Sequence, residues 1–421
     1  MLRLIRNILS DSSDNFTFHC YNQSNNINLR EKTGLYIHIP FCKNSCPYCP
    51  YIKTKYNVEQ AKEYKKALIK EIELYYKKFG GGSFTSLYFG GGTPTLMINE
   101  IDDILNHLYK YFSIQGNIAI ETSPIDIDKT ILLKLKSQGF NLISLGIQSF
   151  NDKYLTIIGR KYNSQKAINS INDTLNIGFE SVNIDLIFAI NNQTIHDLEN
   201  DLNTTVSFNV DQVTCYPLFT FPYTEIGKIR NLNKIKLPNQ KKRKQLYYFM
   251  NSFFEKKGYT RTNVWSFSKN HNNNYSSVTR DYYLGLGASS GSYNGQTFYF
   301  NTFSIAEYIQ TLNSKLPISI AMQVSKKLEK NFWFYWQLYT TLINKNSYQE
   351  LFNSKVEKDF AFILKLFKRL NYIENEDSSI IKLNTKGAHW IHLIQNYYAL
   401  NYVNKIWTVS KRKAWPEKII L

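Results

Sequence analysis

Three cysteines lie close together in one short stretch of the chain. Cys42, Cys46 and Cys49 have the spacing C-x3-C-x2-C and follow an alternating apolar run that begins at Leu35. Because cysteine thiolates are the usual ligands of iron–sulfur clusters, three of them on one loop can hold three irons of a cubane cluster. The fourth iron is then left without a protein ligand, and a small molecule can chelate it. The alternative is a structural zinc site, in which His38 supplies the fourth ligand.

A glycine run and a glutamate end the next two predicted strands. Thr93 directly follows the run Gly90, Gly91 and Gly92. Glu121 ends the next predicted strand. Since glycine has no Cβ, the backbone of the run can approach a ligand closely, although a bulge or a tight turn uses the same residues. The Glu121 carboxylate can accept hydrogen bonds from a ribose diol. The Thr-Ser-Pro sequence after it is also an ordinary start of a helix.

Three further polar residues follow along the chain. Gln148 ends the fourth predicted strand, Arg160 comes shortly after it, and Asp185 lies within the apolar fifth strand. A carboxylate inside such a strand needs a partner or a function. We therefore expect Asp185 either to form a buried ion pair with Arg160 or to contact a ligand.

Six strand-then-helix units carry these residues. The predicted strands cover residues 35–40, 86–89, 117–121, 142–148, 182–190 and 212–218. They are rich in Ile, Leu and Val, as expected of parallel strands that are buried on both faces. An open or incomplete (β/α) barrel accommodates this number of units, and a doubly wound sheet is the alternative. In either fold the loops after the C-terminal ends of the strands build the site, and the cysteine loop and Glu121 fall there.

The strand–helix alternation stops after Asn301. The rest of the chain is predicted to be mainly helical, with helices at 328–342, 356–370 and 385–398 and a short strand at 380–383. We therefore predict an N-terminal extension over residues 1–34, a catalytic domain over 35–302 and a smaller, mainly helical C-terminal domain over 303–421.

The composition indicates a folded protein with a basic surface. Of the 421 residues, 43% are hydrophobic, which argues against disorder, and the formal net charge is +18. The basic residues are spread along the chain without a nucleic-acid motif, so we expect no nucleic-acid partner; a small polycarboxylate fits the charge at least as well. The five cysteines do not form a disulfide framework, and no apolar run is long enough for a membrane span. Both observations favour the cytoplasm.

Together these motifs resemble the anaerobic, or oxygen-independent, coproporphyrinogen III oxidase family of radical S-adenosylmethionine (SAM) enzymes. The matching stretches are 36–42, 90–95, 144–150, 185–187 and 284–288, with a weaker match at Lys386-Gly387. The resemblance implies an incomplete (β/α)6 radical SAM barrel with a smaller, mainly helical C-terminal domain. It also implies a [4Fe-4S] cluster, one or two molecules of SAM and an electron donor protein as a partner.

The resemblance assigns roles to residues by their position. The cluster ligands are Cys42, Cys46 and Cys49, and the residues that line the first SAM are Tyr36, Tyr48, Gly91, Gly92, Thr93 and Glu121. The positions that match contacts with a second SAM are Gln148, Arg160 and Asp185, and backbone contacts are expected from Phe219 and Gly291. No catalytic acid or base is assigned.

The resemblance implies that a 5′-deoxyadenosyl radical abstracts hydrogen from a tetrapyrrole-like substrate such as a porphyrinogen. Two departures leave alternatives open. Tyr51 stands where the oxidases have a further cysteine, which the related heme chaperones also lack. Those chaperones use a His-Asn-x-x-Tyr-Trp signature for heme, and here His271 begins a similar run in which Ser276 replaces the tryptophan. Heme binding and delivery is therefore one alternative, with heme as a further ligand, and radical C-methylation with two SAM molecules is another.

Overall fold

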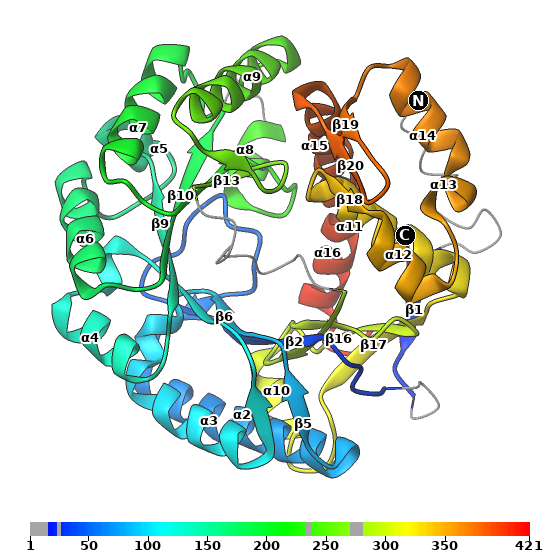
Figure 1. The fold of residues 1–421 in the computed structure, drawn as a ribbon. Coiled ribbons are helices and arrows are strands. Elements are labelled where there is room, and N and C mark those ends of the chain that lie inside the picture. The colour runs from blue at the N-terminus through cyan, green and yellow to red at the C-terminus, as the bar shows by residue number, and fades with distance from the viewer. Residues whose placement is uncertain (1–15, 23–26, 232–236, 270–280) are drawn as a thin grey trace.

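A single large sheet forms the centre of the molecule. The computed structural model describes residues 16–22, 27–231, 237–269 and 281–421. Six parallel strands lie side by side in chain order and curve into an arc (Figure 1). They are β2 (Thr33–Ile39), β6 (Leu87–Gly91), β8 (Ile118–Thr122), β9 (Leu142–Gln148), β10 (Ser181–Phe188) and β11 (Gln212–Pro217). Each predicted strand agrees with the observed one to within about two residues, the usual uncertainty of such boundaries.

One or two helices follow each of these strands, and several lie along the outside of the arc in Figure 1. They are α2 (Val58–Phe79), α3 (Ile98–Tyr111), α4 (Lys129–Ser137), α5 (Asp152–Ile157), α6 (Ser164–Ile177), α7 (Ile195–Ser207), α8 (Glu225–Asn231) and α9 (Gln240–Lys256). Side-chain caps fix many of their starts: Thr194 and Asp197 form a reciprocal capping box at the start of α7. The result is the incomplete (β/α)6 barrel that the alternation predicted.

Shorter elements complete the loops of this barrel. The short strands pair as β3 (Phe41–Cys42) with β4 (Thr54–Lys55), and β5 (Gly82–Phe84) with β7 (Phe112–Ile114). Two 3-10 helices follow barrel strands: η1 (Pro94–Met97) after β6 and η2 (Pro124–Asp126) after β8. No helix in the described part of the chain is both long and apolar enough to cross a membrane.

The sheet continues beyond the six parallel strands at both edges. Next to β2 lies β14 (Tyr282–Leu286), followed in order by β15 (Gly291–Tyr293), β16 (Thr297–Asn301), β17 (Ile318–Gln323), β1 (Thr17–Cys20) and β21 (Lys418–Ile420). The other edge carries β13 (Ser266–Ser268) and β12 (Thr260–Arg261). The sequence did not predict these strands. The sheet thus crosses both predicted domain limits, at residues 34 and 302, and the limits themselves stay a prediction.

Helices of the C-terminal region stand across the open side of the arc (Figure 1). This region contains α10 (Ile305–Thr311), α11 (Lys326–Tyr339), β18 (Leu342–Asn344), α12 (Lys345–Phe352), α13 (Val356–Asp359), α14 (Ala361–Arg369), β19 (Ile373–Glu376), β20 (Ile380–Leu383), α15 (Thr385–Tyr398), the π-helix η3 (Ala399–Val403) and α16 (Asn404–Arg412). Two predicted helices are shorter than expected. Thr341 has a left-handed φ of 60° after the end of α11, and Phe360 separates α13 from α14.

The strand register brings polar residues of neighbouring strands together. Tyr36 of β2 is the partner of Tyr88 in β6, and Glu121 of β8 is the partner of Ser144 in β9. The pairing of β9 with β10 shifts before Gln148, whose φ of 71° is unusual for a residue other than glycine. Neighbouring strand ends therefore present their side chains to one shared space.

Candidate functional site

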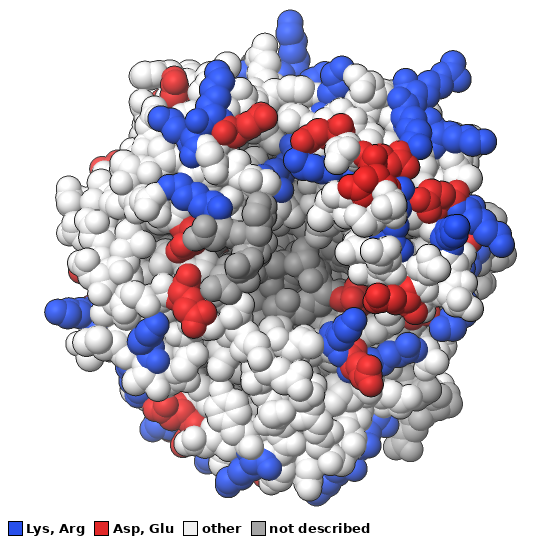
Figure 2. Space-filling model, in the orientation of Figure 1, with Lys and Arg blue, Asp and Glu red and all other residues white. Residues whose placement is uncertain are grey.

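A cavity of about 720 Å³ lies between the C-terminal ends of the barrel strands and helices α11, α15 and α16. Figure 2 shows the centre of this face hollowed, with basic and acidic side chains mixed around the rim instead of forming one positive field. Every residue that the resemblance assigned to the cluster or to SAM, including the three cysteines, lines this cavity. The structure thus brings the predicted residues together, and their individual contacts with a cofactor stay predictions.

The loop that carries the cysteines is held from several sides. The amide of Ile226 in α8 donates a hydrogen bond to the carbonyl of Pro47 (3.1 Å), and Lys43 forms an ion pair with buried Asp126 (3.0 Å). Gly159 lies so close to Pro47 that a Cβ at position 159 would be 2.6 Å from the proline ring. Loops that follow three different barrel strands therefore fix the position of the cysteine loop.

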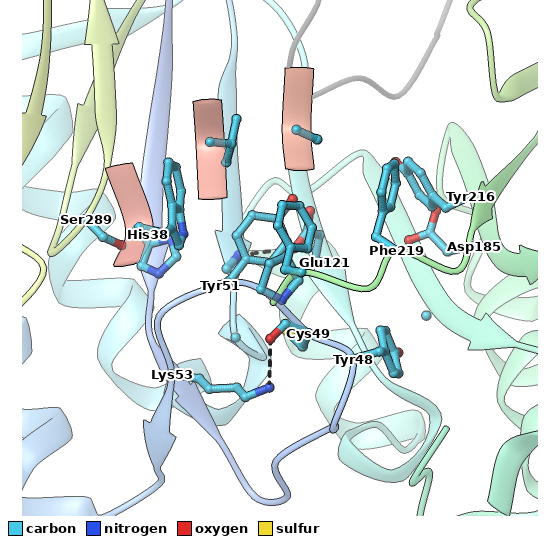
Figure 3. A pocket seen from close by; sticks show the side chains of 18 of the residues that line it. His38, Tyr48, Cys49, Tyr51, Lys53, Glu121, Asp185, Tyr216, Phe219 and Ser289 are labelled. Atoms are coloured by element: carbon cyan, nitrogen blue, oxygen red, sulfur yellow. Dashed lines mark hydrogen bonds between the residues drawn. The ribbon is translucent and has the colours of Figure 1, made fainter. Parts of the chain in front are cut away.

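Lys53 holds the same loop from within. Its ammonium donates hydrogen bonds to the carbonyls of Cys46 (2.8 Å) and Cys49 (3.5 Å), the second of which is drawn in Figure 3. The Cys49 amide also donates to the Cys46 carbonyl (3.2 Å). Sequence reasoning missed Lys53, because a lysine that binds backbone carbonyls belongs to no spacing motif.

The three thiols supply the kind of ligand that an iron–sulfur cluster uses. Burial and the neighbouring Cys49 raise the pKa of Cys42 to about 11, so binding of a metal would release its proton. Among the described residues, no three Cys, His, Asp or Glu side chains are gathered closely enough to hold one metal ion. A cubane binds each thiolate at a different corner, so its ligands are spread more widely than those around one zinc ion.

His38 is not placed to complete a zinc site. Its Nδ1 is hydrogen-bonded to the Tyr36 hydroxyl (2.9 Å), and its Nε2 lies 3.4 Å from the carbonyl of Ile52. Burial lowers the pKa of His38 to about 4, so the ring is neutral at pH 7. With Nε2–H donating to the carbonyl and Nδ1 accepting from the tyrosine, both ring nitrogens are already used.

The glycine run packs directly against the strand that leads into the cysteine loop. The Gly92 amide donates to the carbonyl of Ile39 (2.7 Å), and a Cβ at position 92 would lie 2.4 Å from the Phe41 carbonyl oxygen. Gly91 has a φ of 115°, and a Cβ there would be 2.5 Å from the His38 ring. The close approach of the two strands therefore requires glycine at these positions. This requirement holds whether or not a ligand also approaches the glycine run.

Glu121 lies at the end of β8 beside the middle of the cavity (Figure 3). The Tyr88 hydroxyl donates to its Oε1 (2.5 Å), and the Gly91 amide donates to its Oε2 (3.1 Å). Burial raises the pKa of Glu121 to about 7, and nearby Asp185 acts in the same direction. Each carboxylate oxygen has two lone pairs, so the group can accept further hydrogen bonds from a diol.

The ion pair with Arg160, one of the two alternatives for Asp185, is not formed in the described structure. Asp185 instead accepts hydrogen bonds from the Ser144 hydroxyl (3.1 Å) and the Asn183 amide (2.9 Å). Burial raises the pKa of Asp185 to about 6, while the charge of Arg160 acts to lower it. Asp185 is therefore held by its neighbours in the sheet, which leaves ligand contact as the role predicted for it.

Arg160 lies between two aromatic rings on the other side of the cysteine loop. Its guanidinium carbon is 5.9 Å from the ring centre of Tyr48 and 5.8 Å from that of Tyr162. Its Nε is buried and has no hydrogen-bond partner in the described structure. A buried N–H of this kind is a donor for an anionic group of a ligand.

Three other predicted or noted positions complete this side of the cavity. Tyr51 lies next to Glu121 in Figure 3, lines the cavity and is 52% exposed, and partial burial of its ring raises its pKa. Phe219 packs edge to face on Trp265 (5.5 Å), and Gly291 lies in β15, close to the Phe300 ring. The predicted heme histidine, His271, lies outside the described residues.

The opposite side of the cavity is an aromatic wall that the sequence analysis did not predict. We use this name for the cavity-lining aromatic residues of α11, α15, η3 and α16, which are Phe332, Tyr335, Trp336, Tyr339, Tyr397, Tyr398, Tyr402 and Trp407. The aromatic run over residues 332–336 is visible in the sequence and was the available signal. The π-helix η3 interrupts the regular helix within this wall, and such π-helical turns are frequent at functional sites.

Comparisons with known proteins agree with this geometry. Residues 36–204 match the Radical SAM superfamily. The chain is 29% identical to the heme chaperone HemW of Bacillus subtilis over 82% of this chain and 93% of that protein. It is 27% identical to the oxygen-independent coproporphyrinogen III oxidase of Escherichia coli over 67% of this chain and 66% of that protein.

A solved structure agrees with the fold. Coproporphyrinogen III oxidase (HemN) from Escherichia coli superimposes with a TM-score of 0.74, covering 88% of this chain and 90% of that one, at 23% identity. Residues 36–204 thus match the radical SAM superfamily and the chain has the fold of that solved structure, which confirms the predicted fold class. The proteins that it resembles include a heme chaperone and an oxygen-independent coproporphyrinogen III oxidase, as the sequence motifs indicated. A match to this superfamily implies a [4Fe-4S] cluster and SAM as cofactors, in agreement with the sequence motifs.

Proposed function

We propose that the protein is a radical SAM enzyme that acts on a tetrapyrrole-like substrate. Cys42, Cys46 and Cys49 hold the cluster, SAM binds beside Glu121, and the substrate lies against the aromatic wall. The observation that carries the proposal is the continuity of one cavity, about 720 Å³ in volume, from the cysteine loop to the aromatic wall. A cavity of this size with an aromatic lining and a few polar groups is typical of a site for a flat organic ligand.

When bound and reduced by an electron donor, the cluster and SAM together supply a 5′-deoxyadenosyl radical. The side chains of the protein bind and orient the ligands for this chemistry. Glu121 accepts hydrogen bonds from ribose hydroxyls, while Arg160 and Asp185 offer opposite charges to the carboxylate and ammonium groups of an amino acid moiety. The aromatic wall excludes water from the space in which hydrogen is abstracted.

A heme chaperone is the second candidate function. It is favoured by Tyr51, which occupies the place of the additional oxidase cysteine, and by the similarity to heme chaperone HemW over 93% of the length of that protein. In this case the cavity keeps the cluster and SAM, and the aromatic wall holds heme for delivery instead of a substrate for oxidation.

Anaerobic reconstitution with iron and sulfide tests the cofactor part of the proposal. We expect broad absorbance at about 400 nm, as for other thiolate-bound clusters. After reduction with SAM present, we expect release of 5′-deoxyadenosine. Cys46→Ala should abolish both, whereas Cys20→Ser, which changes an exposed cysteine in β1 outside the loop, should abolish neither. A wild-type protein that binds zinc and releases no 5′-deoxyadenosine would show that the proposal is wrong.

Incubation of the reconstituted protein with coproporphyrinogen III and with heme separates the two candidates. An enzyme is expected to consume the porphyrinogen and form vinyl groups with a matching yield of 5′-deoxyadenosine. A chaperone is expected to bind heme stoichiometrically in a spectral titration, to leave the porphyrinogen unchanged and to lose heme binding in His271→Ala.

A further inference from the structure

The last helix of the chain reaches across the cavity to the cysteine loop. Near the end of α16, the ammonium of Lys411 donates a hydrogen bond to the carbonyl of Pro50 (3.1 Å), the residue directly after Cys49. The Tyr223 hydroxyl donates to the same carbonyl oxygen (3.2 Å). The Lys411 ammonium also lies 4.3 Å from the ring centre of Tyr223, a close cation–π contact. Three segments far apart in the sequence therefore meet at one backbone carbonyl.

Two lysines place positive charge beside this loop. Lys53 binds the carbonyls of Cys46 and Cys49 from one side, and Lys411 binds that of Pro50 from another. Within the described structure neither ammonium forms an ion pair with a carboxylate. Partial burial, together with the charge of Lys53, lowers the pKa of Lys411 to about 8, so most of it is still protonated at pH 7. The charges of both lysines are therefore directed at the cysteine loop.

We propose that Lys411 is a positioning residue that ties the C-terminal helix α16 to the cysteine loop and favours the reduced form of the cluster. The proposal rests on the proposed function, in which Cys42, Cys46 and Cys49 hold that cluster. Reduction adds one electron, supplied by a low-potential reductant, to a group that already carries three thiolates, and no covalent bond forms or breaks. A cation nearby in a poorly solvated site stabilises the added negative charge more than it stabilises the oxidised form.

Substitutions at Lys411 separate its charge from its hydrogen bond. Lys411→Arg keeps both, Lys411→Gln keeps a donor and removes the charge, and Lys411→Met removes both. The measurement is the midpoint potential of the reconstituted cluster, from the electron paramagnetic resonance signal during an anaerobic redox titration. We expect Lys411→Gln and Lys411→Met each to shift the reduction equilibrium about tenfold toward the oxidised form, which lowers the midpoint potential by about 59 mV for a one-electron couple. Lys411→Arg should keep the wild-type potential.

Lys413→Gln is the matched control. It removes the same charge two residues further on, where Lys413 pairs with Glu417 and, among the described residues, forms no hydrogen bond or ion pair with the cysteine loop. This variant should change the reduction equilibrium of the cluster by less than about twofold relative to the wild type. A potential in Lys411→Gln equal to that of the wild type, or a shift in Lys413→Gln as large as that in Lys411→Gln, would overturn the role of the Lys411 charge.

The hydrogen bond is tested by the rate at which air destroys the cluster. We expect about a threefold faster loss of absorbance in Lys411→Met than in Lys411→Gln, because only the glutamine retains a donor for the Pro50 carbonyl. Equal rates of cluster loss in the two variants would show that the hydrogen bond of Lys411 does not stabilise the contact between α16 and the cysteine loop. A wild-type protein that takes up no cluster would instead contradict the proposed function, so the two failures are distinguishable.

Discussion

The two sides of the cavity are built in different ways. On the barrel side, Glu121 and Asp185 each accept two hydrogen bonds from protein groups, and the register of adjacent strands fixes their positions. On the side of the C-terminal helices the wall is aromatic, and the Tyr335 hydroxyl and the Gln395 Oε1 are buried without a partner among the described residues. The barrel side is thus preorganised for a polar ligand of defined shape. The aromatic wall suits a flat apolar ligand that supplies its own polar groups.

The largest expected effect concerns the support behind the barrel side. Glu71 of α2 is fully buried and accepts hydrogen bonds from the Gly287 amide (2.8 Å), the Asn301 amide group (2.7 Å) and the Tyr308 hydroxyl (2.5 Å). Glu71→Ala leaves these buried donors without an acceptor, so we expect the free energy of unfolding to fall by about 3–5 kcal/mol in chemical denaturation. Glu63→Ala, at an exposed position of the same helix, should change it by less than about 0.5 kcal/mol.

The pH dependence of stability should distinguish the barrel from the C-terminal region. Burial raises the pKa of Glu71 and of Glu121 to about 7, from 4.5 in an exposed chain. Between these pH values the folded protein binds more protons than the unfolded chain, so these groups make stability fall as pH rises. In the C-terminal region burial lowers the pKa of His389 to about 4 and that of His392 to about 3. There the unfolded chain binds more protons below about pH 6.5, so stability rises with pH.

Glu71→Gln isolates the contribution of the barrel to this balance. Relative to the wild type, the free energy of unfolding of this variant should increase by about 3 kcal/mol between pH 4.5 and pH 7.5, because its glutamine no longer titrates. Denaturant titrations of both proteins at several pH values measure this difference. A constant difference across the range would show that the Glu71 carboxyl titrates at its ordinary value.

Removal of Glu121 should affect the polar side alone. Glu121→Ala deletes the carboxylate that we expect to accept hydrogen bonds from ribose. Such bonds to a charged group contribute about 1.5–3 kcal/mol, so SAM affinity should fall about 10-fold to 100-fold. Equilibrium dialysis of the reconstituted variant measures this, and heme titration of the same sample should give an unchanged affinity. A parallel loss of both ligands would mean that the two sides of the cavity are not independent.

The reciprocal change tests the aromatic wall and has the smallest expected effect. Trp336→Ala removes a large ring from α11, so affinity for heme or a porphyrin should fall about tenfold while SAM affinity is unchanged. Absorbance titration with heme provides the measurement. Tyr109→Ala, at an exposed position on α3 away from the cavity, is the control. Heme affinity equal to that of the wild type in Trp336→Ala would place the ligand elsewhere.

The parallel part of the fold could be predicted from the sequence because its signals are local. Each barrel strand is an apolar run followed by its own helix, so a short window of sequence contains the evidence. The antiparallel strands were missed because they are short and their partners are distant in the chain: β1 pairs with β17 and β21, some 300 to 400 residues away. A pattern within a short window of sequence cannot indicate a pairing between strands so far apart in the chain.

The same difference applies within the site. Cys42 and its two neighbours follow a spacing motif, but Lys53 and Lys411 act on backbone carbonyls, which any residue supplies. For Asp185 the sequence indicated the need for a partner. The partners Ser144 and Asn183 are identified only by the register of β9 and β10, which pairs these two residues.

Helix α16 has a consequence for the thermodynamics of the whole site. Ile406 and Trp407 line the cavity, and one turn later Lys411 holds the Pro50 carbonyl next to the cysteine loop. A ligand that displaces this helix on binding therefore changes the reduction potential of the cluster. Linkage is reciprocal, so reduction of the cluster changes the affinity for that ligand by the same factor. Electron transfer and occupancy of the cavity are then two coupled equilibria that share one helix.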